Sequence, residues 1–255
     1  MADIHGTQVV RRVGAILRAV GSRGRDGISA AELALELDLS RSTVHRLLAS
    51  LAVEGLLDRE GSRWRTGPEL HLLGAASSPR YNVRDAALPI VRELADLTGE
   101  SAFFSARRGT ESVCLIREDG GFPIRSFVLH EGMRFPLGVA SAGLAILSFE
   151  SDDWIDEYLQ SAALETRWGA SHDSSLVRAR IGQTRETGYA VNPGLIVEGS
   201  WGMGAAVFDG GGEPLWALSL NGVESRFRPE RQEELGRLLV EHAHALSREL
   251  VNWHS

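Results

Sequence analysis

The sequence contains no lysine, because all 27 of its basic residues are arginine. This absence excludes the phosphate-binding P-loop and any chemistry that uses lysine as a Schiff base or a general base. Cysteine is nearly absent as well, and the single residue, Cys114, cannot form an internal disulfide or a thiolate metal cage. It lies in an alternating, strand-like run, where we expect it to act as a small buried apolar residue.

Long apolar runs are also missing. No stretch approaches the roughly 18 residues that a membrane helix needs. The N-terminal residues Met1–His5 have neither the charged nor the apolar region of a signal peptide. The 255 residues, of which 43% are hydrophobic, are sufficient for two domains with sizeable cores. We therefore expect a soluble, cytoplasmic protein with no membrane partner.

The candidate sequence motifs for catalysis, cofactor binding and metal binding each lack a required residue or spacing. Residues 198–202 miss the serine nucleophile elbow because position 198 is not glycine, and Gly202-Met203-Gly204 lacks the third glycine of a dinucleotide-binding loop. His242 and His244 are two residues apart on a predicted helix, so they face apart and make a poor metal pair. We predict no catalytic residue, no metal site and no cofactor. A hydrolase or isomerase built on the second half of the chain is kept as the alternative function.

The charge is divided unevenly along the chain. The net charge is −7, but residues 1–78 hold ten Arg against nine Asp and Glu (+1), and the rest holds 17 against 25 (−8). The acidic character therefore belongs to the second half. Any binding of nucleic acid must depend on locally placed arginines and on two copies that act together.

Two short helices joined by a tight turn are predicted between Ser29 and Gly55. Ser29-Ala30-Ala31-Glu32 has the form of a capping box, and it opens a helix with an apolar face. Asp38-Leu39-Ser40 forms the connection, and Ser40 is placed to cap the second helix. The spacing of Val44, Leu47, Leu48 and Leu51 is that of one buried helical face. This pattern indicates a helix-turn-helix. An earlier helix supplies the third wall of its core, with Val9, Val10, Val13, Leu17 and Val20 on one face.

The outer face of the second helix is polar and cationic, as expected of a helix that enters the DNA major groove. We predict that Ser42, Thr43, His45 and Arg46 contact base edges, next to Ser40 at the start of the helix. A basic β-hairpin follows, with strands at 56–59 and 63–66, and it resembles a wing. Four arginines are predicted to hold phosphates: Arg41, Arg59, Arg63 and Arg65. The alternatives are a small helical core with an ordinary charged surface, or a docking module for another protein.

A short apolar helix follows the wing. Gly67-Pro68 restarts a helix, and Leu70, Leu72, Leu73, Ala75 and Ala76 make it apolar on more than one side. We interpret it as a linker helix that helps to pair two subunits, or else one that packs on its own chain. The predicted domains are a winged helix-turn-helix at 1–67, the linker at 68–78, and a second domain at 79–255, with the boundary at Ser77-Ser78-Pro79.

The second domain is predicted to be α+β. A helix from Asn82 to Thr98 precedes strand-like runs at 101–106, 112–117 and 124–130. The chain is extended again at 189–191, and a hairpin joins runs at 203–208 and 215–221. Helices are expected at 141–148, from 152, at 174–187 and from Pro229. The result is a mainly antiparallel sheet of about six strands, flanked by helices.

Small polar residues share one face of that sheet. Ser219 and Asn221 are two residues apart on one strand, and Gly202 begins the partner strand, where close approach is possible. Such a face suits a small organic ligand. Equally, these residues could be surface positions on a half-exposed sheet.

The order of several motifs resembles that of the IclR family of bacterial transcriptional regulators. These motifs are the wing, the linker helix, Arg134-Phe135-Pro136-Leu137 before SAGLAILS at 141–148, Gly188–Val191, and Ala205–Asp209. The resemblance covers nearly the whole chain. It implies a winged helix-turn-helix and a GAF-like effector domain, assembled as homodimers or homotetramers on double-stranded operator DNA. It also implies an effector pocket formed by Ser141, Ala142, Asn192, Gly202, Ser219 and Asn221.

The sequence departs from the family pattern at four positions. The family often has histidine where Gly138 stands, a basic residue at Leu144, an acidic residue at Asn192 and cysteine at Gly202. These changes predict a pocket that is less polar and roomier than one built for a two- or three-carbon keto acid. We therefore expect a larger effector, an aromatic or other carboxylic acid, with Phe127 and Leu129 on one strand face as candidate lining, unless these two belong to the core.

Overall fold

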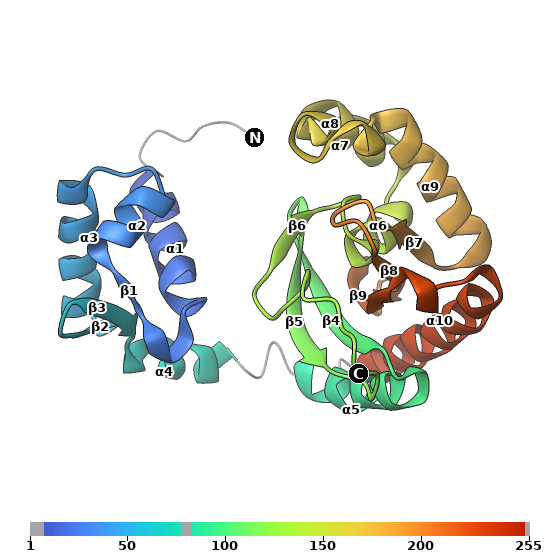
Figure 1. Ribbon diagram of the computed structural model, residues 1–255, viewed down its shortest axis with the longest axis horizontal. Coiled ribbons are helices and arrows are strands. Elements are labelled where there is room, and N and C mark those ends of the chain that lie inside the picture. The colour runs from blue at the N-terminus through green and yellow to red at the C-terminus, as the bar shows by residue number, and fades with distance from the viewer. Residues whose placement is uncertain (1–7, 78–82, 253–255) are drawn as a thin grey trace. The chain divides into compact units, whose positions relative to one another are not determined.

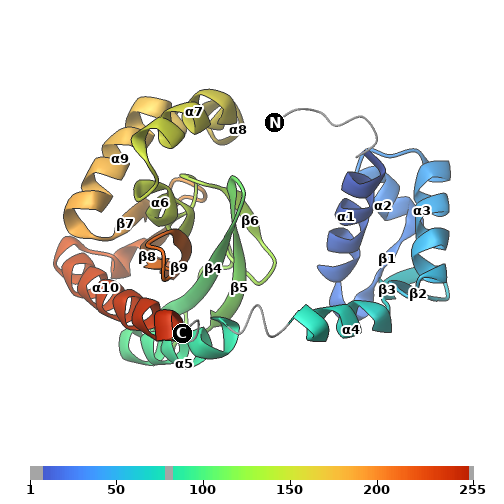
Figure 2. The same cartoon turned by 180° about the vertical axis from the view of Figure 1, so that it is seen from behind.

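The computed structural model describes residues 8–77 and 83–252 (Figures 1 and 2). The chain forms two compact units, Met1–Asn82 and Val83–Ser255. The expectations for Met1–His5 and for the boundary after Ser77 fall at least partly outside the described residues. Each unit has its own hydrophobic core.

The first unit is a three-helix core with a small sheet. Its elements are α1 (Gln8–Gly21), η1 (Gly24–Asp26), β1 (Ile28–Ser29), α2 (Ala30–Glu36), α3 (Arg41–Val53), β2 (Leu57–Glu60), β3 (Arg63–Thr66) and α4 (Pro68–Ser77). The sheet order is β1-β3-β2, and all pairs are antiparallel. The predicted helices and wing are confirmed, whereas β1 was not predicted.

Local chemistry explains the tight turn between α2 and α3. The Ser29 hydroxyl accepts a hydrogen bond from the Glu32 N–H, and the Glu32 carboxylate accepts one from the Ser29 N–H, which completes the predicted capping box. Ser40 caps α3 through the Thr43 N–H at 3.2 Å. Asp38 has a left-handed backbone (φ 49°), which short polar side chains tolerate better than most. Leu48, on the inner face of α3, is fully buried.

The second unit is a six-stranded antiparallel sheet between two helical layers. Its strands are β4 (Ser101–Arg108), β5 (Glu111–Glu118), β6 (Arg134–Pro136), β7 (Ala190–Pro193), β8 (Ser200–Phe208) and β9 (Pro214–Val223), in the order β6-β5-β4-β9-β8-β7. Its helices are α5 (Val83–Thr98), α6 (Ser141–Ser148), α7 (Asp152–Ala162), α8 (Leu164–Trp168), η3 (Ala170–His172), α9 (Ser174–Thr187), η4 (Glu224–Arg226) and α10 (Pro229–Asn252). The predicted α+β class is therefore confirmed.

The two helical layers cover opposite faces of the sheet. α5 and α10 pack on one face, and α6 packs on the other, with α7, α8 and α9 beyond it (Figure 1). α6 is buried along its whole length, because its small residues allow close contact with β8 and β9. A Cβ on Gly204 would lie 3.0 Å from the Ser141 carbonyl carbon, so glycine is required where α6 begins.

The strand predicted at 124–130 is wrong. The chain between β5 and β6, residues 119–133, is a loop, and the edge strand is the three-residue β6. In this loop, arginine side chains satisfy backbone carbonyls that a strand would pair: Arg125 donates to the carbonyls of Gly120 and Phe122, and Arg117 donates to that of Leu129. The apolar residues of 124–130 therefore do not belong to a strand.

Candidate functional site

The outer face of α3 is exposed and cationic. Ser42, His45 and Arg46 point away from the core, opposite Val44 and Leu48, which are fully buried. Among the described residues, the side chains of Arg41, His45 and Arg46 have no hydrogen-bond or ion-pair partner. These groups are therefore available to an external ligand.

The polar side chains at the start of α3 are held by the helix cap. Besides its bond to the Thr43 N–H, the Ser40 hydroxyl lies 2.9 Å from the Thr43 hydroxyl and 3.1 Å from that of Ser42. This small network fixes the first turn of α3, which is the part of a recognition helix that lies nearest to base edges.

The wing arginines, in contrast, are engaged with the protein. Arg59 donates to the Gly61 carbonyl at 3.0 Å, and Arg65 forms an ion pair with Glu60. Arg63 donates to the Gly27 carbonyl at 3.0 Å and lies 3.6 Å from Glu32. Because these pairs are largely exposed, they contribute little to stability and a phosphate could replace the acidic partners.

Two arginines that sequence reasoning missed lie beside the wing. Arg23 and Arg25 line a cleft together with Arg63 and Arg65, and Asp26 and Glu32 complete its charged lining. No periodic signal marks Arg23 and Arg25, because they lie in the irregular turn around η1.

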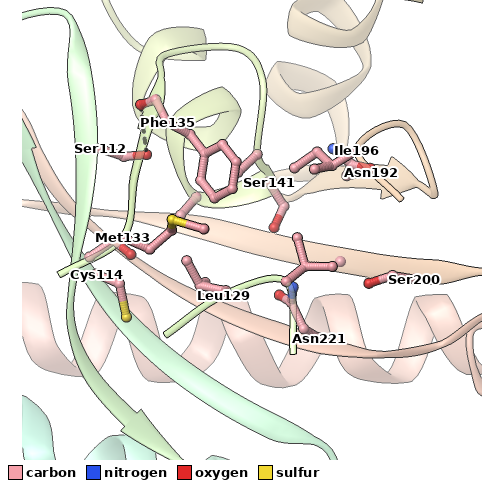
Figure 3. Close-up of a pocket in the computed structure, with 15 residues that line it drawn as sticks. Ser112, Cys114, Leu129, Met133, Phe135, Ser141, Asn192, Ile196, Ser200 and Asn221 are labelled. Carbon is pink, nitrogen blue, oxygen red and sulfur yellow. Dashed lines mark hydrogen bonds between the residues drawn. The ribbon is translucent and has the colours of Figure 1, made fainter. Parts of the chain in front are cut away.

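The second unit contains a pocket between the start of α6, the sheet and the two loops 119–133 and 193–199 (Figure 3). The residues that line it are Ser105, Ser112, Cys114, Val128, Leu129, Met133, Phe135, Ala140, Ser141, Ala142, Asn192, Ile196, Ser200, Gly202 and Asn221. None of these described lining residues is charged. The cavity that they enclose is narrow, with a volume of about 20 Å³. The predicted low polarity fits this lining, whereas the predicted roominess is not found in this conformation.

Most of the predicted pocket residues are brought together here. Leu129, Ser141, Ala142, Asn192, Gly202 and Asn221 all line the pocket. Ser219 lies on the same face of β9 but is fully buried and outside the lining, and its hydroxyl has no partner among the described residues. The structure thus brings six of the eight predicted residues together.

Phe127 is not part of the pocket. Its side chain is 75% exposed, and the guanidinium of Arg117 lies 5.2 Å from the centre of its ring. The prediction placed Phe127 beside Leu129 on one strand face, but the segment is a loop, so residues two apart are not held on the same side.

Asn192 has a structural role as well as a place in the lining. Its amide nitrogen donates to the Val139 carbonyl at 2.7 Å, and its amide oxygen accepts from the Leu195 N–H at 2.9 Å. An acidic residue, which cannot donate when ionised, could not make the first bond. Asn192 thus joins the β7 edge to the chain just before α6.

The start of α6 has no side-chain cap. Ala140 occupies the N-cap position, and it offers no oxygen to the N–H groups of the first turn. Ala140, Ser141 and Ala142 all border the pocket. The partial positive charge of this helix end is the main electrostatic feature of an otherwise neutral site.

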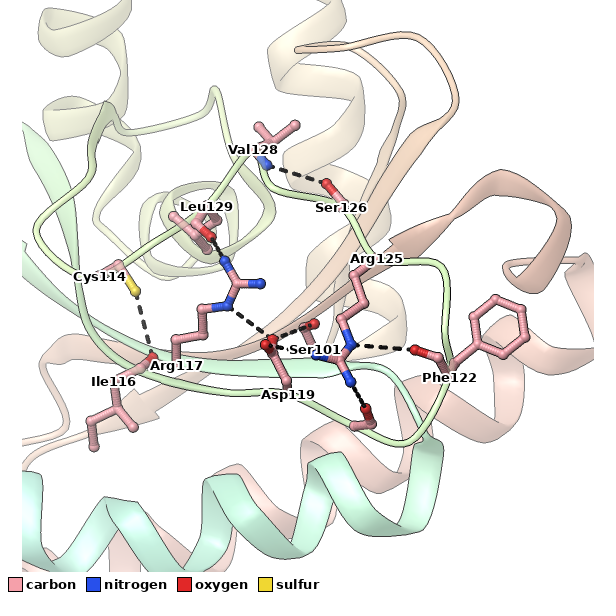
Figure 4. Close-up of polar contacts among 11 residues, drawn as sticks. Ser101, Cys114, Ile116, Arg117, Asp119, Phe122, Arg125, Ser126, Val128 and Leu129 are labelled. Carbon is pink, nitrogen blue, oxygen red and sulfur yellow. Dashed lines mark hydrogen bonds and ion pairs between the residues drawn. The ribbon is translucent and has the colours of Figure 1, made fainter.

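A cluster of charged residues holds the loop 119–133 over the pocket (Figure 4). Asp119 accepts hydrogen bonds from Arg117 (2.9 Å), Arg125 (3.1 Å) and Ser101 (2.9 Å). Burial would raise the pKa of Asp119, but the bonds from Arg117 and Ser101 and the arginine charges outweigh it and hold the pKa below its usual value. We call these four residues the Asp119 cluster.

A second contact joins the loop 119–133 to the first residue of β8. The hydroxyls of Ser126 and Ser200 lie 2.6 Å apart, and Ser126 also accepts from the Val128 N–H. The next residue, Leu129, forms part of the apolar end of the pocket together with Met133, Phe135 and Cys114. Burial raises the pKa of Cys114 to about 12, so its thiol is neutral at physiological pH.

Other classes of site are not found in the described part of the chain. No group of three or more His, Cys, Asp or Glu side chains there could hold a metal ion. No described helix is long and apolar enough to cross a membrane.

Comparisons with known proteins match both units. The family model for the IclR helix-turn-helix domain matches residues 9–61, and that for the bacterial transcriptional regulator IclR C-terminal matches residues 75–248. The HTH-type transcriptional regulator BhcR of Paracoccus denitrificans is 29% identical over 225 residues, which cover 87% of this chain and 80% of BhcR.

Solved structures agree. The Thermotoga maritima IclR has a TM-score of 0.71 and 26% identity, with 96% of this chain and 99% of that chain covered. An IclR homologue from Microbacterium hydrocarbonoxydans, complexed with 4-hydroxybenzoate, has a TM-score of 0.75 and 21% identity, with 95% and 100% covered. The chain, with a helix-turn-helix unit and an effector-type unit matched in one order, belongs to the IclR family of bacterial transcriptional regulators.

Proposed function

We propose that this transcriptional regulator binds operator DNA through α3 and the wing, and that a small organic acid bound in the pocket of the second unit controls that binding. The observation that carries the DNA part is the exposed outer face of α3, where Arg41, His45 and Arg46 have no partner among the described residues. A regulator of this kind acts on the bacterial chromosome, and therefore in the cytoplasm.

The DNA contacts divide into two kinds. Ser42, Thr43, His45 and Arg46 contact base edges in the major groove, since they occupy the first turns of α3, where Ser40 sets the cap. Phosphates are held by Arg41, Arg59, Arg63 and Arg65. The three wing arginines must exchange protein partners for phosphates, so they add affinity and little sequence preference.

Two copies of the chain act together, as a homodimer or homotetramer. A single winged unit carries little net charge, so one copy offers few phosphate contacts. The side chains of Leu72 and Leu73 on α4 are 60% and 54% exposed, which supports pairing through the linker helix rather than packing on its own chain. Paired half-sites would then be separated by whole turns of DNA, about 34–36 Å each.

The effector is an organic acid with an apolar body. Its carboxylate is placed at the uncapped N–H groups of α6, because the described lining offers no cationic side chain. Its apolar part lies against Leu129, Met133 and Phe135. An aromatic acid needs more width than the present pocket provides, so the loop 119–133 must move outward for the ligand to enter.

Binding without turnover is favoured over catalysis. The described lining contains no carboxylate and no histidine, and its one thiol has a raised pKa of about 12. It therefore lacks a general acid or base that is active near neutral pH. A bound acid should be recovered chemically unchanged after incubation with the protein.

The experiment that tests the proposal uses the full chain. Fragments of bacterial DNA that bind the protein are selected, and the affinity of the best fragment is measured by fluorescence anisotropy with and without each member of a carboxylic-acid panel. We expect salt-dependent binding that at least one acid changes. Failure to retain any duplex at low salt would overturn the DNA part, and an affinity that no acid alters would overturn the effector part.

A further inference from the structure

At Gly202 the pocket lining has no side chain. Gly202 on β8 pairs with Asn221 on β9. A Cβ built on Gly202 would lie 3.0 Å from the Ser141 hydroxyl oxygen and 3.2 Å from the amide oxygen of Asn221. Because Gly202 has no Cβ, these two polar groups from different elements can converge on one point of the pocket lining, which we call the notch (Figure 3).

Asn221 brings an unsatisfied acceptor to this notch. Its amide oxygen is buried and has no hydrogen-bond partner among the described residues. A buried acceptor without a partner is unfavourable, and most such groups in folded proteins are paired. In the same pocket, the Asn192 amide is bonded to the protein through both its nitrogen and its oxygen, whereas the Asn221 oxygen is left for a ligand.

Chemistry decides which group fits. A carboxylate only accepts hydrogen bonds, so it cannot pair with the Asn221 oxygen. A hydroxyl can donate to Asn221 and also bond to the Ser141 hydroxyl, which can donate or accept. No described lining residue is charged, so hydrogen bonds of this kind, together with shape, set the selectivity.

We propose that the notch formed by Gly202, Asn221 and Ser141 selects effectors that carry a hydroxyl group, so that the ligand is a hydroxylated organic acid. This rests on the proposed effector function of the pocket. The hydroxyl occupies the notch and donates to Asn221, while the carboxylate binds at the start of α6. A ligand without the hydroxyl leaves Asn221 unpaired, and it is rejected for that reason.

The test uses acids in matched pairs that differ by one hydroxyl: 4-hydroxybenzoate and 3-hydroxybenzoate against benzoate, mandelate against phenylacetate, and lactate against propionate. Thermal shift identifies binders to the full-length protein, and calorimetry gives their affinities. We expect at least one hydroxylated acid to bind about tenfold or more tightly than its partner.

Three variants locate the preference. Gly202→Ala places a methyl group against Ser141 and Asn221, and it should reduce the preference for the hydroxylated acid to about twofold. Gly182→Ala is the matched control, because it lies on α9 and no atom is near its Cβ position. Asn221→Ala removes the acceptor without adding an atom beside Ser141, so it should also abolish the preference, and it keeps the proposal testable if Gly202→Ala fails to fold.

The outcomes separate two failures. Equal binding of both members of every pair would overturn the selectivity but leave the effector function standing. A preference that survives in Gly202→Ala would overturn the assignment to the notch. Binding of no acid from either series would overturn the acid class of effector, and the selectivity with it.

Discussion

The two units of this chain place their functional groups in opposite ways. In the first unit, cationic side chains such as Arg46 stand on the outer face of a helix whose inner face is the core. In the second, uncharged groups such as Ser141 and Asn221 face inward, beneath two loops. An exposed cationic face suits a highly charged polymer, whereas a closed neutral pocket suits a small molecule that is released again.

The largest expected effect tests whether the two units are stable independently. Leu48 is fully buried in the first unit, so Leu48→Ala should destabilise that unit by about 2–5 kcal/mol. DNA binding should be lost while the second unit retains its thermal transition. Leu144→Ala in α6 is the corresponding variant of the second unit, and it should lower the stability of the second unit only. A single transition that shifts equally in both variants would contradict two independent units.

The next effect concerns the closed pocket. Asp119→Asn removes the charge that binds Arg117 and Arg125. The free energy of opening the loop should therefore fall by about 1.5–3 kcal/mol, so the loop should open more often. Cys114 is the chain's only cysteine and lines the pocket, so its rate of alkylation reports the opening. We expect labelling to be about tenfold to a hundredfold faster, with Asp96→Asn on the surface of α5 as the control.

The same cluster gives a pH dependence. Because the folded pKa of Asp119 is lowered, its stabilisation is fully present above the unfolded pKa, and it is lost as the pH falls through the folded value. The cluster is therefore intact at neutral pH. Labelling of Cys114 that is unaffected by Asp119→Asn would show that the cluster does not hold the loop.

A comparable effect is expected on the outer face of α3. Arg46→Ala should weaken binding to the selected operator by about 1–3 kcal/mol and relax its sequence preference. Arg237→Ala on α10 changes the net charge equally and lies in the other unit, so it should leave operator binding unchanged. Competition between matched and mutated operators measures both properties. An unchanged affinity in Arg46→Ala would remove α3 from the role of reader.

The smallest effect is expected at the wing. Arg63→Ala removes one phosphate contact, so all duplexes should be bound more weakly to a similar extent, and the salt slope should fall by about 1. Titrations of specific and unrelated duplexes at several salt concentrations measure this. A loss confined to one operator sequence would mean that Arg63 contacts bases instead.

The sequence predicts the two units unequally. The helices of the first unit follow from a 3.6-residue apolar period, and the capping box at Ser29 is readable from four letters. The two-residue β1 has no such period. Arg23 and Arg25 lie in an irregular turn that no pattern marks.

In the second unit, most strands and the longer helices were predictable, but the short α8 and the walls of the pocket were not. Ser112, Cys114, Met133 and Phe135 come from separate segments that only the folded sheet brings together. Within the loop 119–133, residues 124–130 include several apolar residues, as a strand often does. The side chains of Arg117, in β5, and Arg125, in the loop, donate hydrogen bonds to carbonyl groups of the loop. Such side-chain contacts leave no local signal in the sequence.

The account's central claim is that the pocket and the DNA surface are energetically coupled. The direct measurement is reciprocal: the affinity of a bound acid is measured by calorimetry with and without saturating operator, and the affinity of the operator with and without saturating acid. Coupled sites must change each other's affinity by the same factor. We predict that the factor by which operator changes the affinity for the acid equals the factor by which the acid changes the affinity for operator, and that this factor differs from one. An acid that binds the pocket with the same affinity whether or not operator is present would contradict the account.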